Sequence, residues 1–212
     1  MNILRVAFFV ISFLITFICF GQNFNIGIVS GINSSTIRGF EYEDDYSSKP
    51  SLNLGFSLEY GLTNSLSTLI HLQYDVKAVD RTISFLDLSQ GTYNDVTNTT
   101  KYNYLTIPLL IRYKIGKGNL KGFVNIGGFI SFLQSVSYEG EELNMRNYEK
   151  QEFGLVGGVG LLYKLNNKLN ITLEGRDSYG LTNISAIPVD YNDGEIKTNT
   201  ISILLGFSIN VK

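Results

Sequence analysis

The single histidine is the residue of this sequence best suited to acid–base chemistry. His71 shares one face of an alternating segment with Asp75, and such a pair could provide the general base of a membrane-embedded lipid-modifying enzyme, a hydrolase or an acyltransferase. A Ser-His-acid site also needs a nucleophile and an oxyanion pocket, and no motif distinguishes any of the serines. We therefore expect a hydrogen-bonding role for His71, no catalytic residues and a protein that is not an enzyme.

Two further patterns could bind ligands. The glycine-rich run 154–160 looks like a phosphate loop, but no Lys-Ser or Lys-Thr follows it and it alternates as a strand does, so no cofactor is expected. Acidic side chains gather in two polar segments, and together they could bind calcium: Glu41, Glu43, Asp44, Asp45, Glu139, Glu141 and Glu142. Their spacing matches no defined calcium loop, so solvated acidic loops without a metal site are expected.

Tyrosines are frequent in the polar segments. They suit contact surfaces, and a protein or glycan partner at these segments is a further expectation. The residues concerned are Tyr42, Tyr46, Tyr93, Tyr138 and Tyr191.

Composition narrows the class of protein that must position these residues. Charged residues make up 17% of the chain, below the roughly 25% of ordinary soluble domains, whereas aromatic residues reach 13%. Disorder and coiled coil are therefore unexpected. The 17 Lys and Arg residues are scattered and the net charge is -2, so no nucleic-acid partner is expected.

The N-terminus has the features of a signal peptide. Arg5 precedes an apolar run from Val6 to Phe20, and the small residues Cys19 and Gly21 suit cleavage after Gly21. A spanning anchor is disfavoured because it needs about 20 apolar residues. The sequence thus predicts a signal peptide at 1–21 and one domain at 22–212, which lacks cysteine and so has no disulfide, zinc thiolate or cysteine nucleophile.

Strict alternation of apolar and polar residues dominates the mature chain. In Leu52–Tyr60 every even position is large and apolar, and every odd position is small or polar. Such a pattern fits a β-strand and no helix. Eight segments follow it: 23–32, 52–60, 67–77, 105–114, 120–135, 152–165, 169–176 and 201–210.

Connections of two lengths separate these strands. Residues 62–65, 116–119 and 166–167 are tight turns, whereas 33–50, 79–100, 137–151 and 181–198 are long and polar. An even strand number with short turns at one end and long loops at the other predicts an all-β, eight-stranded, antiparallel up-and-down transmembrane β-barrel. The short turns and both termini would be periplasmic, and the long loops extracellular.

Alternation alone does not say which face points outward. A soluble lipocalin-like barrel would turn its apolar face inward, but an eight-stranded interior is too narrow for so many large side chains. The polar face carries small residues that suit a crowded lumen: Gly55, Gly127, Gly154, Gly158, Gly160 and Gly206. Five tyrosines fall on the apolar face near strand ends and predict two aromatic girdles: Tyr60, Tyr113 and Tyr163 beside the turns, Tyr74 and Tyr179 near the loops.

Charged side chains on the polar face predict a paired lumen network. Its members are Glu59, His71, Asp75, Lys77, Arg112, Lys114, Glu174 and Arg176, with Lys121 and Lys164 as further inward-facing cations. Buried charges are costly unless paired, so we expect ion pairs, among them Glu174 with Arg112, and no conducting pore. Pro108 cannot donate to a ladder, and a bulge is predicted there.

The segments Tyr104–Tyr113, Gly127–Phe129 and Glu174–Ile184 carry a resemblance to the PorT-like family of outer-membrane β-barrel proteins. The resemblance covers essentially the whole mature chain and implies an eight-stranded barrel in a Gram-negative outer membrane. The founder of that family is linked to type IX secretion, but many members lack this role. Thr106 stands where the family often has a carboxylate. Asp177 replaces a common aromatic residue, which suggests that its strand has left the apolar zone there.

These observations predict an integral outer-membrane protein whose immediate partner is outer-membrane lipid. It would act as a structural or interaction component, including an accessory part in secretion, through its extracellular loops. A membrane-embedded lipid-modifying enzyme, a small channel and a soluble lipocalin-like binding protein remain the alternatives. The sequence names neither the oligomeric state nor a loop ligand.

Overall fold

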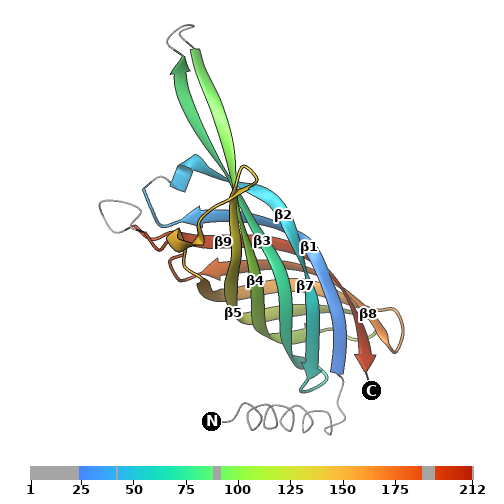
Figure 1. The fold of residues 1–212 in the computed structure, drawn as a ribbon. Coiled ribbons are helices and arrows are strands. Elements are labelled where there is room, and N and C mark those ends of the chain that lie inside the picture. The colour runs from blue at the N-terminus through green and yellow to red at the C-terminus, as the bar shows by residue number, and fades with distance from the viewer. Residues whose placement is uncertain (1–23, 42, 88–91, 188–193, 212) are drawn as a thin grey trace, which may run out of the picture.

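Eight long strands make up nearly all of the computed structural model, which describes residues 24–41, 43–87, 92–187 and 194–211 (Figure 1). They are β1 (Phe24–Arg38), β2 (Tyr46–Gly61), β3 (Leu66–Asp87), β4 (Thr92–Ile115), β5 (Leu120–Tyr138), β7 (Gln151–Lys164), β8 (Leu169–Gly180) and β9 (Lys197–Val211). A two-residue strand, β6 (Glu141–Glu142), and two short 3-10 turns, η1 (Glu43–Asp45) and η2 (Met145–Asn147), lie in the connections. The predicted signal peptide at 1–21 lies outside the described residues.

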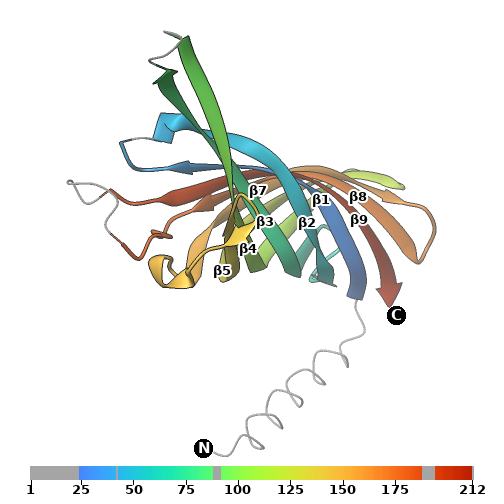
Figure 2. The ribbon, with the colours of Figure 1, turned by 45° about the horizontal axis from the view of Figure 1, so that its top comes forward.

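The strands close into a ring. Each long strand pairs antiparallel with the next along the chain, and β1 pairs with β9 from Phe24 opposite Val211 to Arg38 opposite Lys197. β6 adds only two pairs to the loop end of β5. The predicted eight-stranded up-and-down barrel is therefore confirmed, and both views show the strands inclined around it (Figures 1 and 2).

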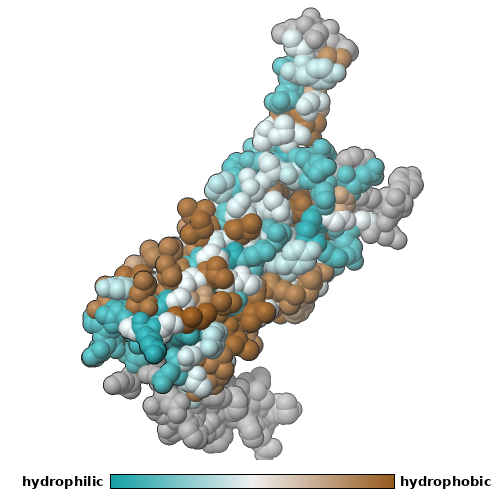
Figure 3. All heavy atoms as spheres, turned by 180° about the vertical axis from the view of Figure 1, so that it is seen from behind, coloured by the Kyte–Doolittle hydropathy of each residue, from teal (hydrophilic) through white to brown (hydrophobic). Residues whose placement is uncertain are grey.

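The apolar face of the sheet points outward. Phe56 is 65% exposed, whereas Glu59 on the opposite face of β2 is 7% exposed. Figure 3 shows apolar side chains covering the body of the barrel, with hydrophilic side chains toward its ends. We call this exposed apolar surface around the barrel the apolar belt; such a surface needs lipid around it. The lipocalin-like alternative is contradicted, because it requires the apolar face inside.

None of the helices in the described ranges is long and apolar enough to cross a membrane. The predicted girdle residues lie on the outer face of the strands. Tyr113 and Tyr163 are exposed beside the short turns and Tyr60 is half-buried there, while Tyr74 and Tyr179 are exposed farther along their strands.

The short turns stand where the sequence places them. Residues 62–65 join β2 to β3, 116–119 join β4 to β5, and 165–168 join β7 to β8. Gly116 and Gly118 have φ of 109° and 81°, a conformation that favours glycine. The Asn166 side chain accepts hydrogen bonds from the backbone N–H groups of Lys168 and Leu169, both at 2.8 Å. We call this end of the barrel the turn end and the opposite end the loop end.

The loop boundaries were predicted wrongly. Segments 33–50 and 79–100 were expected to be loops, but β1 continues to Arg38, β2 begins at Tyr46, and β3 and β4 extend far into the second segment. Polar side chains do not identify a loop here, because a strand that extends beyond the bilayer needs no apolar face. Cross-strand pairs such as Thr82 with Thr97, whose hydroxyl oxygens lie 2.9 Å apart, sustain the ladder instead.

The bulge predicted at Pro108 is also wrong. β4 keeps its alternation through Pro108, and the pairing of β4 with β5 is continuous there. The ladder between β3 and β4 instead lacks pairs at Ile107 and Pro108, so the missing N–H faces β3. The register shift lies farther along, between Asn103 and Tyr104, and a second one interrupts β2 between Lys49 and Asn53. A single missing donor is thus absorbed without an extra residue.

Candidate functional site

The half of the lumen nearer the turn end contains an ionic cluster centred on Arg112. Its Nη1 lies 3.1 Å from Glu59 Oε2 and its Nη2 lies 3.5 Å from Glu174 Oε2. Its Nε donates to Asn125 Oδ1 at 2.9 Å, and its guanidinium group lies 3.9 Å from the centre of the Phe123 ring. The expected pair of Glu174 with Arg112 is therefore present. The side chain of Arg112 fills the centre of the barrel from β4 and neutralises carboxylates of β2 and β8.

Two neighbouring cations complete this cluster. Lys114 also pairs with Glu59. Arg176 donates two hydrogen bonds to Glu174, from Nε to Oε1 at 2.8 Å and from Nη2 to Oε2 at 3.0 Å. The planar guanidinium group matches the carboxylate in this two-point geometry, so the pair is fixed in direction as well as in charge.

The half nearer the loop end contains a second ionic cluster. Lys77 Nζ lies 2.7 Å from Glu152 Oε2 and 2.9 Å from Thr198 Oγ1, and the side chains of Lys77 and Glu152 are 2% and 0% exposed. Asp75 accepts bonds from Asn33 Nδ2 at 2.5 Å and from the Thr106 hydroxyl at 3.2 Å. These contacts connect β1, β3, β4, β7 and β9 across the lumen.

All eight residues of the expected network face the lumen. Seven are buried and Lys114 is half-buried. Glu152 is a further lumen carboxylate that the expected network lacks, although its position two residues before Gly154 on the inward face of β7 indicates it. With Glu152 included, four carboxylates face four cations in these two clusters. The two further cations, Lys121 and Lys164, stand at the turn end of β5 and β7.

The lumen is also partly apolar, which the alternation did not predict. Four buried side chains from β3, β4, β5 and β7 pack together inside it: Leu69, Leu110, Phe129 and Val156. Lys77 Nζ lies 5.3 Å from the centre of the Phe129 ring. A cavity beside His71, Glu59 and Arg112 has a volume of about 20 Å³, room for a single water molecule.

The His71 ring lies beside Arg176 in the lumen. Its Nδ1 lies 3.5 Å from Nη2 of Arg176, and neither a serine hydroxyl nor Asp75 makes a hydrogen bond to its ring there. A general base needs an acceptor that orients it and a proton to remove. The geometry at His71 therefore fits the expected hydrogen-bonding role.

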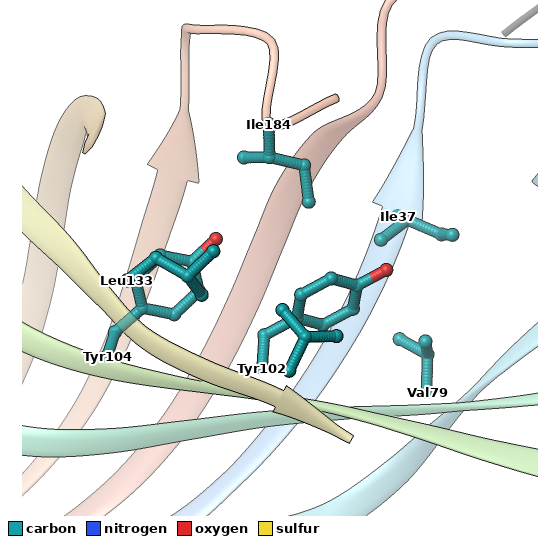
Figure 4. Close-up of a cluster of buried hydrophobic side chains, with 7 residues drawn as sticks. Ile37, Val79, Tyr102, Tyr104, Leu133 and Ile184 are labelled. Atoms are coloured by element: carbon teal, nitrogen blue, oxygen red, sulfur yellow. The ribbon is translucent and has the colours of Figure 1, made fainter. Parts of the chain in front are cut away.

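A buried apolar cluster closes the loop end of the lumen (Figure 4). Tyr104 and Tyr102 come from β4, and the latter ring meets the Tyr148 ring edge-on with centroids 5.8 Å apart. Burial, with Tyr46 nearby, raises the pKa of the Tyr148 hydroxyl. The buried members are Ile37, Val79, Tyr102, Tyr104, Leu133, Val136 and Ile184. Both β4 tyrosines therefore face inward.

Beyond this cluster β3 and β4 continue as a two-stranded ribbon (Figures 1 and 2). β2 pairs with β3 only as far as Arg81, and β5 pairs with β4 only as far as Thr100. Residues 82–87 and 92–97, here called the hairpin extension, therefore pair only with each other. Four of its large side chains are exposed: Phe85, Leu86, Tyr93 and Val96.

The acidic residues considered as calcium ligands lie in the loop-end connections, and the residues described show no group of acidic or histidine side chains placed to hold a metal ion. Glu43 instead accepts a hydrogen bond from the Gly39 N–H at 2.6 Å. Tyr46 stacks edge-on against Phe40 with centroids 5.6 Å apart. Tyr42 and Tyr191 lie outside the described residues.

Comparison with known proteins gives this geometry a family. A family model described as "Outer membrane protein beta-barrel domain" matches residues 20–186. The chain belongs to this family. No curated protein matches the chain. As a member of this family, the protein resides in the outer membrane of a Gram-negative bacterium.

Solved structures show the same fold. Neisserial surface protein A is similar with a TM-score of 0.55 and 11% identity over 89% of this chain and 97% of that chain. The outer membrane protein AlkL gives a TM-score of 0.51 and 14% identity over 90% of each chain. A major outer membrane protein from Thermus thermophilus gives 0.50 and 16% over 90% and 100%. At sequence identities this low, the similarity between this chain and the three solved structures shows a shared fold and nothing more.

Proposed function

We propose that this protein is a non-enzymatic structural or interaction component of the outer membrane that works through its loop end. The observation that carries the proposal is the filled lumen. Two clusters of buried ion pairs and an apolar cluster occupy it, and the cavity beside Arg112 has room for one water molecule. With these side chains occupying the lumen, we place the function of the protein at the ends and the outer wall of the barrel.

The hairpin extension is the part of the loop end best suited to a partner. Its strands are joined by side-chain pairs such as Ser84 with Asp95, at 2.6 Å, while Phe85, Tyr93 and Val96 remain exposed. Apolar and aromatic side chains gathered outside the bilayer favour contact with another surface. A protein or a glycan at the cell surface is the proposed partner.

A photo-crosslinking residue in place of Tyr93 tests this proposal in intact cells. Because Tyr93 is 74% exposed, the replacement leaves the barrel unchanged, and a discrete adduct is expected. Thr63 in a short turn at the opposite end is the matched control site. Equal adducts from both sites, or none from Tyr93, would contradict a partner at the hairpin extension.

A shortened variant provides the second arm. Arg81 and Asn98 are directly paired, so an Asn-Gly turn can join them and remove residues 82–97. The variant should still fold, and a heat-dependent mobility shift in electrophoresis would show this. In cells it should no longer perform the role of the wild-type protein. Full retention of that role would refute the hairpin extension as the working surface.

The narrower relationship to the PorT-like family, with an accessory part in secretion, is also our proposal. Its support is that two of the resembling segments contribute to one cluster, since Tyr104 of the first and Ile184 of the last are both buried at the loop end. Loss of specific proteins from the culture medium after deletion of the gene is the expected result. An unchanged set of secreted proteins would remove the secretion role and leave the interaction role intact.

The enzyme alternative has a direct test at His71. Membrane lipids extracted from cells with His71→Ala should match those of the wild type, because the His71 ring faces Arg176 rather than a nucleophile. A specific lipid change, restored by the wild-type gene, would contradict the non-enzymatic proposal.

A further inference from the structure

The hairpin extension stands clear of the barrel with both of its strand edges unpaired (Figures 1 and 2). Its two strands pair with each other from Thr82 opposite Thr97 onward, and no third strand of the described chain pairs with them there. In such a ribbon every second residue of each strand directs its backbone N–H and C=O groups away from the other strand. Unpaired edges of this kind are templates for pairing with a further strand.

Hydrogen bonds at the base of the hairpin extension show which residues face outward. The Thr99 N–H donates to Glu139 Oε1, and the Thr99 carbonyl oxygen accepts from the Glu139 N–H at 3.0 Å, so both backbone groups of Thr99 point away from β3. The ladder between β3 and β4 continues from there without a shift. Because the two residues of an antiparallel pair either bond to each other or both face outward, alternation fixes the rest. The outward-facing residues are Thr82, Ser84 and Leu86 on β3, and Tyr93, Asp95 and Thr97 on β4.

Side-chain contacts agree with this assignment. In an antiparallel ladder the side chains of outward-facing pairs approach each other most closely. The hydroxyl oxygens of Thr82 and Thr97 lie 2.9 Å apart, and the Ser84 hydroxyl donates to Asp95 at 2.6 Å. Both contacts occur at pairs assigned as outward-facing.

The β3 edge is built without the usual guards of an edge strand. Natural edges carry lysine, proline or a bulge, whereas residues 82–86 read Thr-Ile-Ser-Phe-Leu and pair with β4 without a shift. These residue types favour strands, and none of them is charged. The β4 edge is better protected, because Glu139 occupies its base at Thr99 and Asp95 places a charge at its centre. The β3 edge is therefore the one open to a further strand.

An extended polypeptide is the molecule that matches such an edge along its length. The outward-facing residues of a strand follow one another at about 7 Å, and a second β-strand offers acceptors and donors at the same repeat. Glycans and lipid headgroups have no such alternating row. Ile83 and Phe85 share one face of the edge, and Phe85 is 54% exposed. An added strand with apolar side chains on that face would cover them.

A second copy of this chain does not fit the β3 edge. All copies in one membrane point their hairpin extensions the same way, so two β3 edges would run parallel. A two-fold axis between them would set Ser84 opposite Ser84, whereas a parallel ladder needs the outward-facing residues of its two strands offset by one position. The β4 edge of a second copy would run antiparallel to β3, but that contact leaves one β3 edge unpaired and does not close.

We propose that the outward edge of β3 at residues 82–86 binds an extended segment of a different protein, which adds to the hairpin extension as a further β-strand. The added strand carries apolar side chains on the face of Ile83 and Phe85. It also carries Lys or Arg, because residues 82–97 contain two aspartates and no cation. This inference rests on the proposed function, since it states how the partner of the hairpin extension is held.

Proline substitutions in cells that carry the photo-crosslinking residue at Tyr93 test the proposal. Ser84 and Asp95 are paired and both of their N–H groups face outward, so proline at either position removes an N–H from one edge and leaves the hairpin ladder intact. Each proline variant is compared with alanine at the same position, which keeps the N–H. A disulfide between Thr82→Cys and Thr97→Cys would show that the hairpin extension stays paired in each variant.

The two edges should respond differently. The adduct should fall at least tenfold from Ser84→Ala to Ser84→Pro, and it should change less than twofold from Asp95→Ala to Asp95→Pro. Three results would overturn strand addition at β3 and leave the proposed function in place: an adduct that Ser84→Pro does not weaken, equal losses with both prolines, or an adduct with a glycan or a second copy of this chain. Absence of any adduct from Tyr93 in the otherwise wild-type chain would overturn the proposed function together with this inference.

Discussion

Replacing Lys77 by methionine should destabilise the barrel strongly. The ammonium group of Lys77 lies 2.7 Å from Glu152, and both side chains are almost completely buried. Met is close to Lys in length, so the change removes the charge and leaves the packing nearly intact. Glu152 then keeps only the hydroxyl of Thr198 as a described partner. Breaking a buried pair at one partner costs about 3–5 kcal/mol, equivalent to a roughly 160- to 4700-fold change in the unfolding equilibrium.

Equilibrium unfolding in urea with the protein in phospholipid vesicles measures this cost. The chain has no tryptophan, so the folded fraction is best read from the mobility of unheated samples in electrophoresis. Lys49→Met is the matched control, because Lys49 pairs with Asp80 at 3.1 Å but is 41% exposed. An exposed pair of this kind contributes about 0–1 kcal/mol.

A double variant separates charge pairing from packing. Lys77→Met with Glu152→Gln removes both charges, and its free energy of unfolding should exceed that of Lys77→Met alone by at least about 1 kcal/mol, because no unpaired buried charge remains. Two results would refute ion pairing in the lumen. In the first, Lys77→Met lowers the free energy of unfolding no more than Lys49→Met does. In the second, the losses in free energy of unfolding from Lys77→Met and Glu152→Gln add up in the double variant.

Four other outcomes are expected. In vesicles, Asp177→Leu should raise the free energy of unfolding by up to about 1 kcal/mol, because it removes a charge from the lipid face. Gly160→Ala should cost about 1–3 kcal/mol, since its Cβ would overlap the Phe123 ring, whereas Gly157→Ala, in open space, should cost less than about 1 kcal/mol. The purified barrel should show no conductance steps in a planar bilayer, and regular steps would contradict a filled lumen. N-terminal sequencing of the protein from outer membranes should begin at Gln22, and an N-terminal Met1 would contradict the signal peptide.

Much of the fold was predictable because a period of two assigns each side chain to one face. The alternation in Leu52–Tyr60 separates Phe56, outside, from Glu59, inside, and the same rule brings Arg112 and Glu174 into one lumen. Turn chemistry added the three short connections. In a closed ring, the alternation and the turn residues together determine the order of the strands and the face to which each side chain points.

What could not be predicted depends on tertiary closure. Polar composition at 79–100 did not distinguish a loop from a ribbon, because outside the bilayer both are solvated. The position of the register shift depends on how β4 and β5 meet near Tyr104, not on the missing donor of Pro108 alone. Glu152 opens the predicted strand 152–165, but nothing in the sequence shows that its partner, Lys77, lies across the lumen from it.

The distribution of charge explains where function can lie in this barrel. Lipid requires an apolar outer face, so the alternation forces polar residues inward, and in so narrow a lumen these must neutralise one another. The carboxylates of Glu59, Glu152 and Glu174 are each paired with a buried or half-buried cation. Asp75 has no ion pair within the described residues and is held instead by hydrogen bonds from Asn33 and Thr106. Because the lumen charges are engaged with one another or with neutral donors, the side chains free to contact another molecule lie outside the lumen, as Phe85 and Tyr93 do on the hairpin extension.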